Sequence, residues 1–259
     1  MARHVGRDRR RRGLGRGGIV TAVAPSCARR AVLQRQDSVE RLQSALLEWF
    51  PENGRHFPWR QTRKAFHILL AEVLLRQTQA ERVVGPYLEL VSRFPDVHAL
   101  ANANVEELRR WFRPLGLVRR SERLVRAAQI MVDQHDGQVP NNLEELLALP
   151  GIGGYSARAV LCLGYGVPVP MVDEGSGRVL RRVLGMLATM PAYSDSQLLR
   201  TVEAMLPQAS SREFNLGLID IAAAYCRPRY PACAQCPLAD GCGHAQSAAR
   251  SRPPPSGRE

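Results

Sequence analysis

The apolar residues of this chain recur at intervals of three and four positions over most of its length, which is the spacing of one face of an α-helix. A first such face consists of Val39, Leu42, Leu46, Leu47 and Phe50. Asp37 and Glu40 precede this face with the spacing of a capping box, so we expect a helix to begin at Asp37. Alternating apolar and polar positions, which are typical of strands, are scarce. The pattern therefore predicts an all-α fold.

Capping pairs also indicate where later helices begin. Asn104 with Glu107, and Asn142 with Glu145, have the spacing of an N-cap and its third helical residue. The periodic pattern predicts further helices at 65–79, 81–93, 121–134, 155–164, 174–187, 194–206 and 211–225. The two ends of the chain lack such a period, and their Arg-, Gly- and Pro-rich composition predicts two disordered tails.

The charge of the chain points to a polyanionic partner. The 259 residues carry a formal net charge of +12, and Lys64 is the only lysine among the 36 basic residues. Such an excess of positive charge favours binding to nucleic acid. No apolar run approaches the roughly 18 residues that cross a bilayer, and none follows the basic N-terminus. We therefore expect a soluble, intracellular protein of the cytoplasm, associated with the nucleoid and not with a membrane.

Close to the C-terminus the cysteines form a group with the spacing C-x6-C-x2-C-x5-C. Its members are Cys226, Cys233, Cys236 and Cys242. Thiolates this close together in an intracellular protein indicate a metal site and not disulfides. Four cysteines suit either zinc or a 4Fe–4S cluster, and the spacing favours neither. Cys27, in the N-terminal tail, and Cys162, in an apolar helix, are not expected to be ligands.

A glycine-rich turn lies between two predicted helices in LPGIGGYSARAV, residues 149–160. Pro150 stops the first helix, and Gly151, Gly153 and Gly154 permit a tight turn. The second helix should begin near Tyr155, with free backbone N–H groups that can bind a phosphate oxygen without reading a base. A plain connector between two helices is the alternative interpretation of this motif.

Two carboxylates stand out from their surroundings. Glu72 is the only acid in AFHILLAEVLLRQTQ, and burial among aliphatic side chains would raise its pKa enough to make it a general acid. Alternatively, Glu72, Arg76 and Gln79 could form an exposed polar stripe at i, i+4 and i+7. Asp173 precedes a helix, where it could be an N-cap kept ionised by backbone hydrogen bonds. Such a permanent anion could also stabilise a positively charged sugar.

Residues 214–242, FNLGLIDIAAAYCRPRYPACAQCPLADGC, resemble the matching segment of the MutY-type adenine glycosylases and of the related thymine mismatch glycosylases. The similarity extends upstream to FPWR at 57–60 and covers most of residues 38–245. It is a resemblance to the endonuclease III superfamily of DNA glycosylases. The resemblance implies a two-lobed helix-hairpin-helix fold that ends in a 4Fe–4S loop, with the cluster, in place of zinc, on the four cysteines.

The resemblance also implies roles for single residues. AEVLLRQTQA is similar to the adenine glycosylase segment whose Glu is catalytic, and Glu72 falls on that position. Asp173 matches the essential Asp of the superfamily. Arg76 or Gln77 would fill the gap that a flipped base leaves in the DNA. The hairpin residues that would contact DNA are Gly151, Gly153, Gly154 and Tyr155.

One departure from the family pattern follows Asp173. The adenine glycosylases usually carry Gly and Asn at the next two positions, where this chain has Glu174 and Gly175. The Asn contact to the sugar–phosphate would therefore be missing, or Ser176 would replace it. Glu174 is either a third acid in the site or an ordinary residue of the first helical turn, and we favour the second interpretation.

The expected organisation places the site between two helical lobes. Residues 64–168 would form a bundle that carries the hairpin. Residues 38–63 and 169–245 would form the lobe that bears the cluster, and residues 1–36 and 246–259 would be the tails. DNA should bind across the cleft of a monomer, with Glu72 and Asp173 facing it from opposite lobes.

The sequence favours a monofunctional DNA glycosylase that acts on double-stranded DNA with a mispaired or damaged base. Bifunctional relatives place a Lys just after the hairpin glycines, where this chain has Tyr155. One protonated and one ionised acid divide the work of glycoside cleavage. Adenine opposite guanine or 8-oxoguanine is the favoured target, because a buried acid can protonate its N7. The alternatives are a thymine or uracil glycosylase for mismatches with guanine, an endonuclease III-like lyase, and a non-catalytic iron–sulfur protein that binds DNA.

Overall fold

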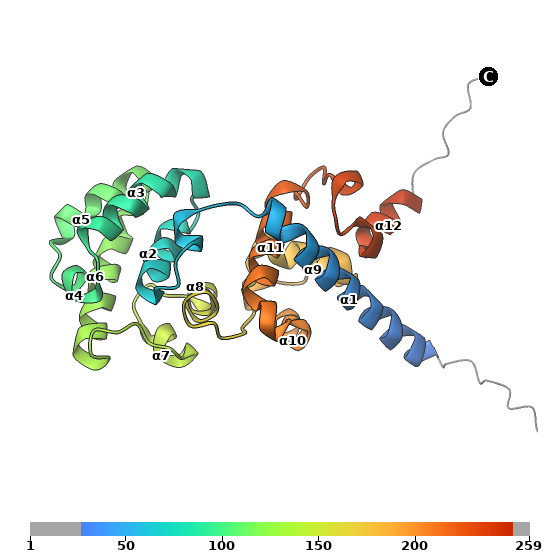
Figure 1. Cartoon of the computed structure of the whole chain (residues 1–259), viewed down its shortest axis with the longest axis horizontal. Coiled ribbons are helices and arrows are strands. Elements are labelled where there is room, and N and C mark those ends of the chain that lie inside the picture. Colours follow the sequence, from blue (N-terminus) through green and yellow to red (C-terminus); the bar gives the residue numbers. More distant parts are fainter. Residues whose placement is uncertain (1–26, 251–259) are drawn as a thin grey trace, which may run out of the picture.

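The computed structural model describes the backbone of residues 27–250 and the side chains of residues 37–247. Most of the two tails expected from the sequence, residues 1–26 and 251–259, therefore lies outside the described residues. Every regular element within 27–250 is a helix, as the all-α prediction requires (Figure 1). No helix in this part of the chain combines the length and the apolar character needed to cross a membrane.

Twelve α-helices follow one another in the described part of the chain. They are α1 (Cys27–Asn53), α2 (Ala65–Leu75), α3 (Ala80–Arg93), α4 (Val97–Ala101), α5 (Val105–Phe112), α6 (Val118–Gln134), α7 (Leu143–Ala148), α8 (Gly154–Ala159), α9 (Glu174–Leu184), α10 (Ser196–Met205), α11 (Ser211–Ala224) and α12 (Gly243–Arg250). One turn of π-helix, η3 (Val160–Gly164), continues α8, and a short 3₁₀ turn, η1 (Pro58–Arg60), precedes α2.

The capping predictions succeed in two places and fail in one. The side chain of Asn104 accepts a hydrogen bond from the backbone N–H of Glu106, and that of Asn142 accepts one from Glu145. The expected start at Asp37 is wrong, because α1 begins at Cys27. The intervening residues are mainly Ala, Arg, Leu and Gln, which favour helix without an apolar period.

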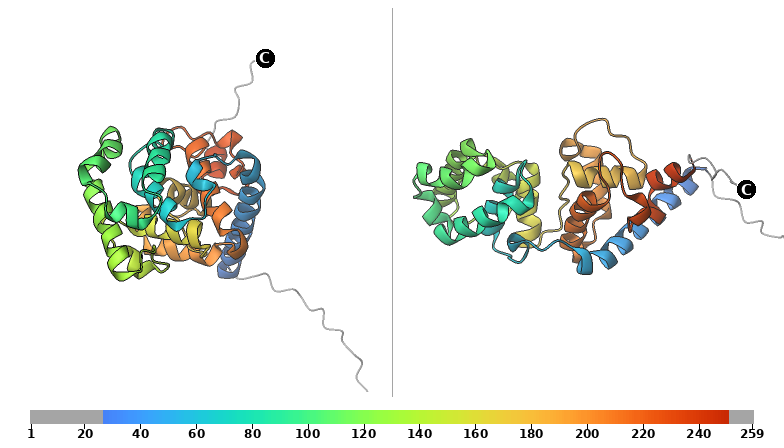
Figure 2. Two further views of the ribbon diagram at one scale, coloured as in Figure 1. Left: turned by 60° about the vertical axis from the view of Figure 1, so that its left-hand side comes forward. Right: turned by 90° about the horizontal axis from the view of Figure 1, so that it is seen from above.

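Two buried apolar clusters organise the helices into the two groups seen in Figures 1 and 2. One cluster runs through α2–α8 and η3, with Leu69, Leu70 and Leu74 of α2 fully buried in it. The other joins α1 to α9, α10 and α11 around Leu46 and Phe214. Because α2 is buried on nearly every side, a polar side chain on it must either bond to a buried partner or face a pocket.

Helix α2 is four residues shorter than the sequence predicts. It ends at Leu75, and Gln77 adopts a left-handed conformation with φ 61°. A left-handed residue cannot continue a right-handed helix. Residues 76–79 therefore form a loop before α3, and Glu72, Arg76 and Gln79 do not share one helical face.

Candidate active site

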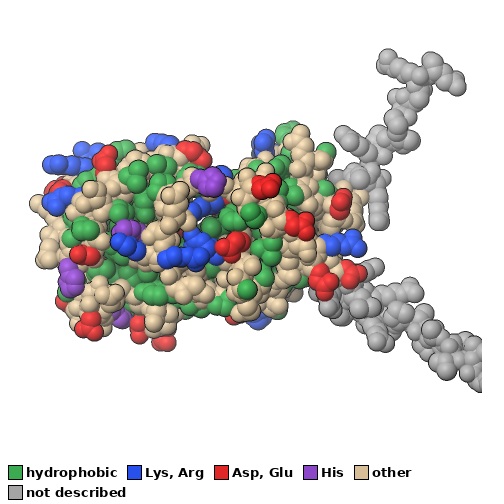
Figure 3. All heavy atoms as spheres, in the orientation of Figure 1, with side chains coloured by type: hydrophobic (Ala, Val, Ile, Leu, Met, Phe, Trp, Pro, Cys, Tyr) green, Lys and Arg blue, Asp and Glu red, His purple; other side chains and the backbone are tan. Residues whose placement is uncertain are grey.

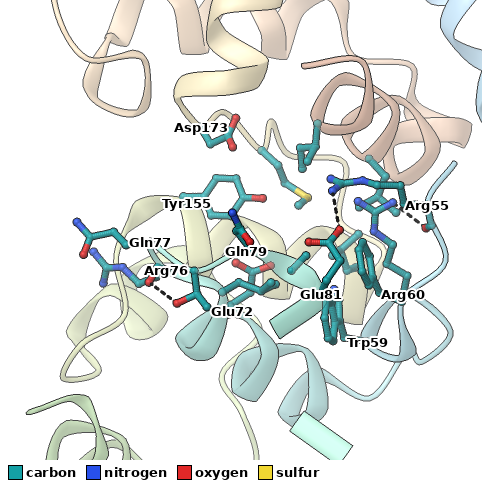
Figure 4. Close-up of a pocket in the computed structure, with 18 residues that line it drawn as sticks. Arg55, Trp59, Arg60, Glu72, Arg76, Gln77, Gln79, Glu81, Tyr155 and Asp173 are labelled. Carbon is teal, nitrogen blue, oxygen red and sulfur yellow. Dashed lines mark hydrogen bonds and ion pairs between the residues drawn. The ribbon is translucent and has the colours of Figure 1, made fainter. Parts of the chain in front are cut away.

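A pocket of about 480 Å³ opens between the two groups of helices. Its walls come from α2, from η1, from the first turn of α8 and from the residue ahead of α9, so segments far apart in the sequence meet here (Figure 4). Basic side chains gather near the middle of the face seen in Figure 3, with acidic ones beside them. The structure brings Glu72, Tyr155 and Asp173 to this one pocket, together with Arg76 and Gln77.

Glu72 lies on the buried helix α2 and is 6 % exposed. Burial and, after it, the negative charge of Asp173 raise the pKa of its carboxyl group, the positive charge of Arg60 opposes them, and the resulting pKa is about 8. Such a group holds its proton at neutral pH. The alternative of an exposed Glu–Arg stripe is wrong, since Arg76 lies beyond the end of the helix and its side chain bonds to the hairpin.

Asp173 is the N-cap of α9. Its Oδ1 accepts hydrogen bonds from the backbone N–H and the hydroxyl of Ser176, both at 2.7 Å, and the N–H of Asp173 donates to the Ser176 hydroxyl at 2.9 Å. This capping box fixes the carboxylate in the pocket wall on the side facing Glu72 across Tyr155 (Figure 4). Asp173 is thus an N-cap that also lines the pocket, so the two interpretations of this residue do not exclude one another.

The residues after Asp173 do not enter the pocket. The side chain of Glu174 accepts a hydrogen bond from the backbone N–H of Ala192 at 2.9 Å, which ties the start of α9 to a neighbouring turn. Ser176 is completely buried in the capping box. Glu174 therefore behaves as a first-turn residue of the helix, and Ser176 is not placed to replace the family's Asn at a sugar–phosphate.

Tyr155 stands between the two carboxylates, on the first turn of α8 (Figure 4). Burial raises the pKa of its phenol well above the ordinary value, and the charges of Glu72 and Asp173 add to the effect. The hydroxyl therefore stays protonated. A neutral aromatic ring in this position offers a flat surface for a planar ligand in the pocket.

The hairpin has the geometry that its glycines suggest. Gly151 adopts φ 87°, which an L residue rarely tolerates, and α8 begins at Gly154, one residue before the predicted start. The N-cap Gly153 makes no side-chain hydrogen bond, and nothing lies within 4 Å of the place its Cβ would occupy. The first N–H groups of α8 are thus open to an approaching phosphate.

A buried ion cluster behind the pocket was not predicted. Asp220 of α11 is 1 % exposed and accepts hydrogen bonds from two arginines, Arg60 at 2.7 and 2.9 Å and Arg55 at 2.7 and 2.9 Å. Burial alone would raise the pKa of Asp220, but these two arginines hold it below the ordinary value. The available signal was an Asp in the apolar run FNLGLIDIAAA, since a buried charge needs a partner.

The four cysteines of the C-terminal loop lie together as half-buried free thiols. Burial raises the pKa of Cys236 to about 11, and the other three cysteines are close enough to add to the shift. An Arg182 Nη1 lies 3.3 Å from the sulfur of Cys226. Among the described residues no three His, Cys, Asp or Glu side chains converge on a point that could hold one metal ion. A 4Fe–4S cluster takes its thiolates on separate irons, so this donor set is compatible with a cluster, which stays a prediction.

Comparisons with known proteins agree with this arrangement. Residues 70–204 match the family described as the HhH-GPD superfamily base excision DNA repair protein. The chain is 37 % identical to a thymine-DNA glycosylase of Aeropyrum pernix, over 79 % of this chain and 94 % of that protein. It is 36 % identical to an adenine DNA glycosylase of Mycobacterium tuberculosis, over 82 % of this chain and 71 % of that protein.

A solved structure supports the same assignment. The structure of a thermostable thymine-DNA glycosylase superposes with a TM-score of 0.75 and 31 % identity, and the match covers 83 % of this chain and 98 % of that chain. The family match spans more than half of the 259 residues and includes both Glu72 and Asp173. The chain belongs to the HhH-GPD superfamily of base excision DNA repair proteins.

Proposed function

We propose that the protein is a monofunctional DNA glycosylase that hydrolyses the N-glycosidic bond of a mispaired base in double-stranded DNA. The observation that carries this proposal is a pocket in which a carboxyl group with a pKa of about 8 faces a capped carboxylate. The names of the relatives, which include thymine and adenine DNA glycosylases, support the reaction class.

The two acids would act in sequence on one flipped nucleotide. Glu72 holds a proton at neutral pH and donates it to the base, which turns the base into a better leaving group. Asp173 is fixed by Ser176 and places its negative charge beside the sugar, where an oxocarbenium-like centre develops. Water then completes the hydrolysis. Tyr155 would stack on the flipped base between them.

Binding to DNA would use the face on which the pocket opens. The open N–H groups of α8 would hold a phosphate, and Arg76 or Gln77 at the pocket mouth would fill the gap in the duplex. We also propose that the two apolar clusters delimit the lobes expected at 64–168 and at 38–63 with 169–245. A cleft between lobes lets DNA reach acids that come from both.

Base removal should not be coupled to strand cleavage. Lyase chemistry needs an amine to form a Schiff base with the sugar. Tyr155 occupies the position of the family's lysine, and Lys64, the only lysine of the chain, is exposed and does not line the pocket. Borohydride should therefore trap no covalent adduct. Efficient trapping that is lost in Lys64→Ala would overturn this assignment.

We favour adenine opposite guanine or 8-oxoguanine as the target. Adenine offers N7 to an acid, and Glu72 is an acid that holds its proton near neutrality. A competition between duplexes that contain A·G, A·8-oxoguanine, T·G or U·G, followed by alkali cleavage, tests the choice. Release of thymine or uracil with adenine untouched in every context would reject adenine while leaving the glycosylase proposal intact.

The second candidate, thymine or uracil opposite guanine, has an observation of its own. These bases leave as anions and are helped by nearby positive charge. Arg55 and Arg60 both line the pocket and share one carboxylate, Asp220, with the exposed Glu81 3.9 Å from Arg55. The two guanidinium groups could stabilise a departing pyrimidine anion. The same four-duplex competition decides between the candidates.

We propose that the four clustered cysteines hold a 4Fe–4S cluster with a structural role. The group would tie the loop after α11 to α9, where Arg182 lies beside the Cys226 sulfur and offsets thiolate charge. Protein purified without oxygen should be yellow-brown and contain about four irons per chain, as this cluster type requires. Stoichiometric zinc in such a preparation would reject the cluster.

A further inference from the structure

The loop between α2 and α3 has a conformation that its own sequence does not favour. Gln77 adopts φ 61°, although it is not a glycine, and it sits at the mouth of the pocket. A residue in this region persists only where its surroundings hold it, and such residues gather at functional sites. Within the loop, Thr78 donates from its N–H to the Leu75 carbonyl oxygen at 3.3 Å and from its hydroxyl to that of Arg76 at 3.4 Å, and a contact from outside the loop adds to these long bonds.

Arg120, from the first turns of α6, supplies that contact. Its Nη1 donates to the carbonyl oxygen of Val73 at 3.3 Å and to that of Arg76 at 3.0 Å. These carbonyls belong to the end of α2, where the helix itself leaves acceptors without partners. Arg120 thus holds the last turn of α2 and the carbonyl group that directly precedes the left-handed residue Gln77.

The loop between α2 and α3 is also connected to the hairpin. The side chain of Arg76 donates to the carbonyl oxygen of Gly151 at 3.2 Å. The Cβ of Arg123 also lies close to that glycine, 3.3 Å from the place where a Gly151 Cβ would be. Helix α6 therefore bonds to the end of α2 through Arg120 and lies close to the hairpin turn at Arg123.

We infer that Arg120 is a positioning residue that holds the loop 76–79 in the shape that places Gln77 at the pocket mouth. The inference rests on the proposed function, because it assigns this loop the task of filling the gap left by the flipped base. Arg120 reaches no reacting atom. Its effect passes through the carbonyl oxygens of Val73 and Arg76, and the Arg76 side chain in turn bonds to the hairpin that would hold the DNA backbone.

The charges around Arg120 argue against a purely stabilising role. Burial lowers the pKa of Arg120, and the positive charges of Arg76 and Arg123 lower it further. Among the side chains described at 37–247, none of these three arginines pairs with a carboxylate at salt-bridge distance. Guanidinium groups without a carboxylate partner repel one another in the free protein. The negative phosphates of bound DNA would relieve that repulsion.

The test compares two duplexes that differ only in how firmly the target base is stacked and paired. One contains the preferred mismatch, and the other places the same base opposite an abasic spacer. Arg120→Ala should lower kcat/KM on the mismatch about 10-fold or more, the scale expected when a group is misplaced near the site. It should have a much smaller effect on the spacer duplex, where flipping is already easy. Arg120→Lys, which keeps the charge and N–H donors, should restore most of the loss.

Arg119→Ala is the matched control, because Arg119 is the exposed neighbour of Arg120 and carries the same charge. We expect it to affect both duplexes equally. Equal losses on both duplexes for Arg120→Ala, or a selective loss in Arg119→Ala, would overturn the inference. Fluorescence of 2-aminopurine beside the target base reports flipping without excision. A wild-type protein that flips the base but does not remove it would therefore refute the proposed function. The effect of Arg120→Ala on flipping could still be measured by the same fluorescence.

Discussion

Two buried carboxylates that both feel the charge of Arg60 have pKa values shifted in opposite directions. Glu72 of α2 is 6 % exposed and Asp220 of α11 is 1 % exposed, yet the pKa of Glu72 rises to about 8 while that of Asp220 falls below its ordinary value. Asp220 accepts hydrogen bonds from Arg55 and Arg60, whereas Glu72 has Asp173 as a like-charged neighbour. Burial disfavours the charged form of both carboxyl groups. The neighbouring charges and hydrogen bonds then determine whether the group is ionised or protonated at neutral pH.

The opposite pKa shifts indicate a structural role for Asp220 and a chemical role for Glu72. An ionised, fully bonded Asp220 joins α11 to the FPWR segment and gives the fold a fixed rear wall for the pocket. A protonated Glu72 in the same pocket has a proton to give. The comparison therefore predicts that Asp220 matters first for stability and Glu72 first for turnover.

The largest expected effect is on stability and tests the structural half of the comparison. Asp220→Asn leaves two guanidinium groups without a counter-ion, one of them on a side chain that is 10 % exposed. Removing one partner of a buried ion pair costs about 3 kcal/mol or more. Denaturant unfolding of the variant should show this loss. Glu107→Gln, which breaks the exposed pair with Arg93, is the control and should cost far less. Equal losses in the two variants would remove the basis for calling Asp220 structural.

Glu72→Gln tests the chemical half. The amide has nearly the same shape but no acidic proton, so the single-turnover rate of base removal should fall at least ~10²-fold. Binding to substrate DNA and the denaturation midpoint should be nearly unchanged, because no charged form is lost at neutral pH. A variant that turns over at nearly the wild-type rate would show that Glu72 is not the general acid.

Asp173→Asn removes the negative charge from this wall of the pocket and keeps the cap. An Asn side-chain oxygen can still accept from the backbone N–H of Ser176, so α9 should begin as before. We expect a rate loss on the order of 10²-fold from the missing charge, with stability nearly constant. Rapid-quench measurements with enzyme in excess give the rate. A loss of stability as large as that of Asp220→Asn would mean that Asp173 acts as a structural anion.

The sequence predicted the features that depend on neighbours along the chain. The caps at Asn104 and Asn142 use residues two or three positions away. The burial of Glu72 follows from the aliphatic residues on either side of it. The same local rules placed the hairpin turn, because only glycine readily adopts the φ of 87° found at Gly151.

The features that the sequence did not predict depend on distant partners. Asp220 is held by arginines 160 and 165 positions away, so its apolar surroundings in the sequence indicate that it needs a partner but do not identify Arg55 and Arg60. The end of α2 was placed too late because Arg120, 44 positions from Arg76, fixes it. Helix propensity at Arg76 and Gln77 favours continuation, and a tertiary contact overrides it.

The smallest expected effect is a shift in a pH profile, and it sharpens the comparison most. If protonated Glu72 is the acid, the rate should be level below pH about 8 and fall tenfold per unit above it, because the deprotonated form cannot donate. Asp173 raises the pKa of Glu72 by its negative charge, so in Asp173→Asn the alkaline limb should move to lower pH. Single-turnover rates from pH 6 to 10 measure the alkaline limb of the wild-type protein and of the variant. An alkaline limb that stays in place would show that Asp173 does not influence the pKa of Glu72, and that the two carboxylates of the pocket act independently.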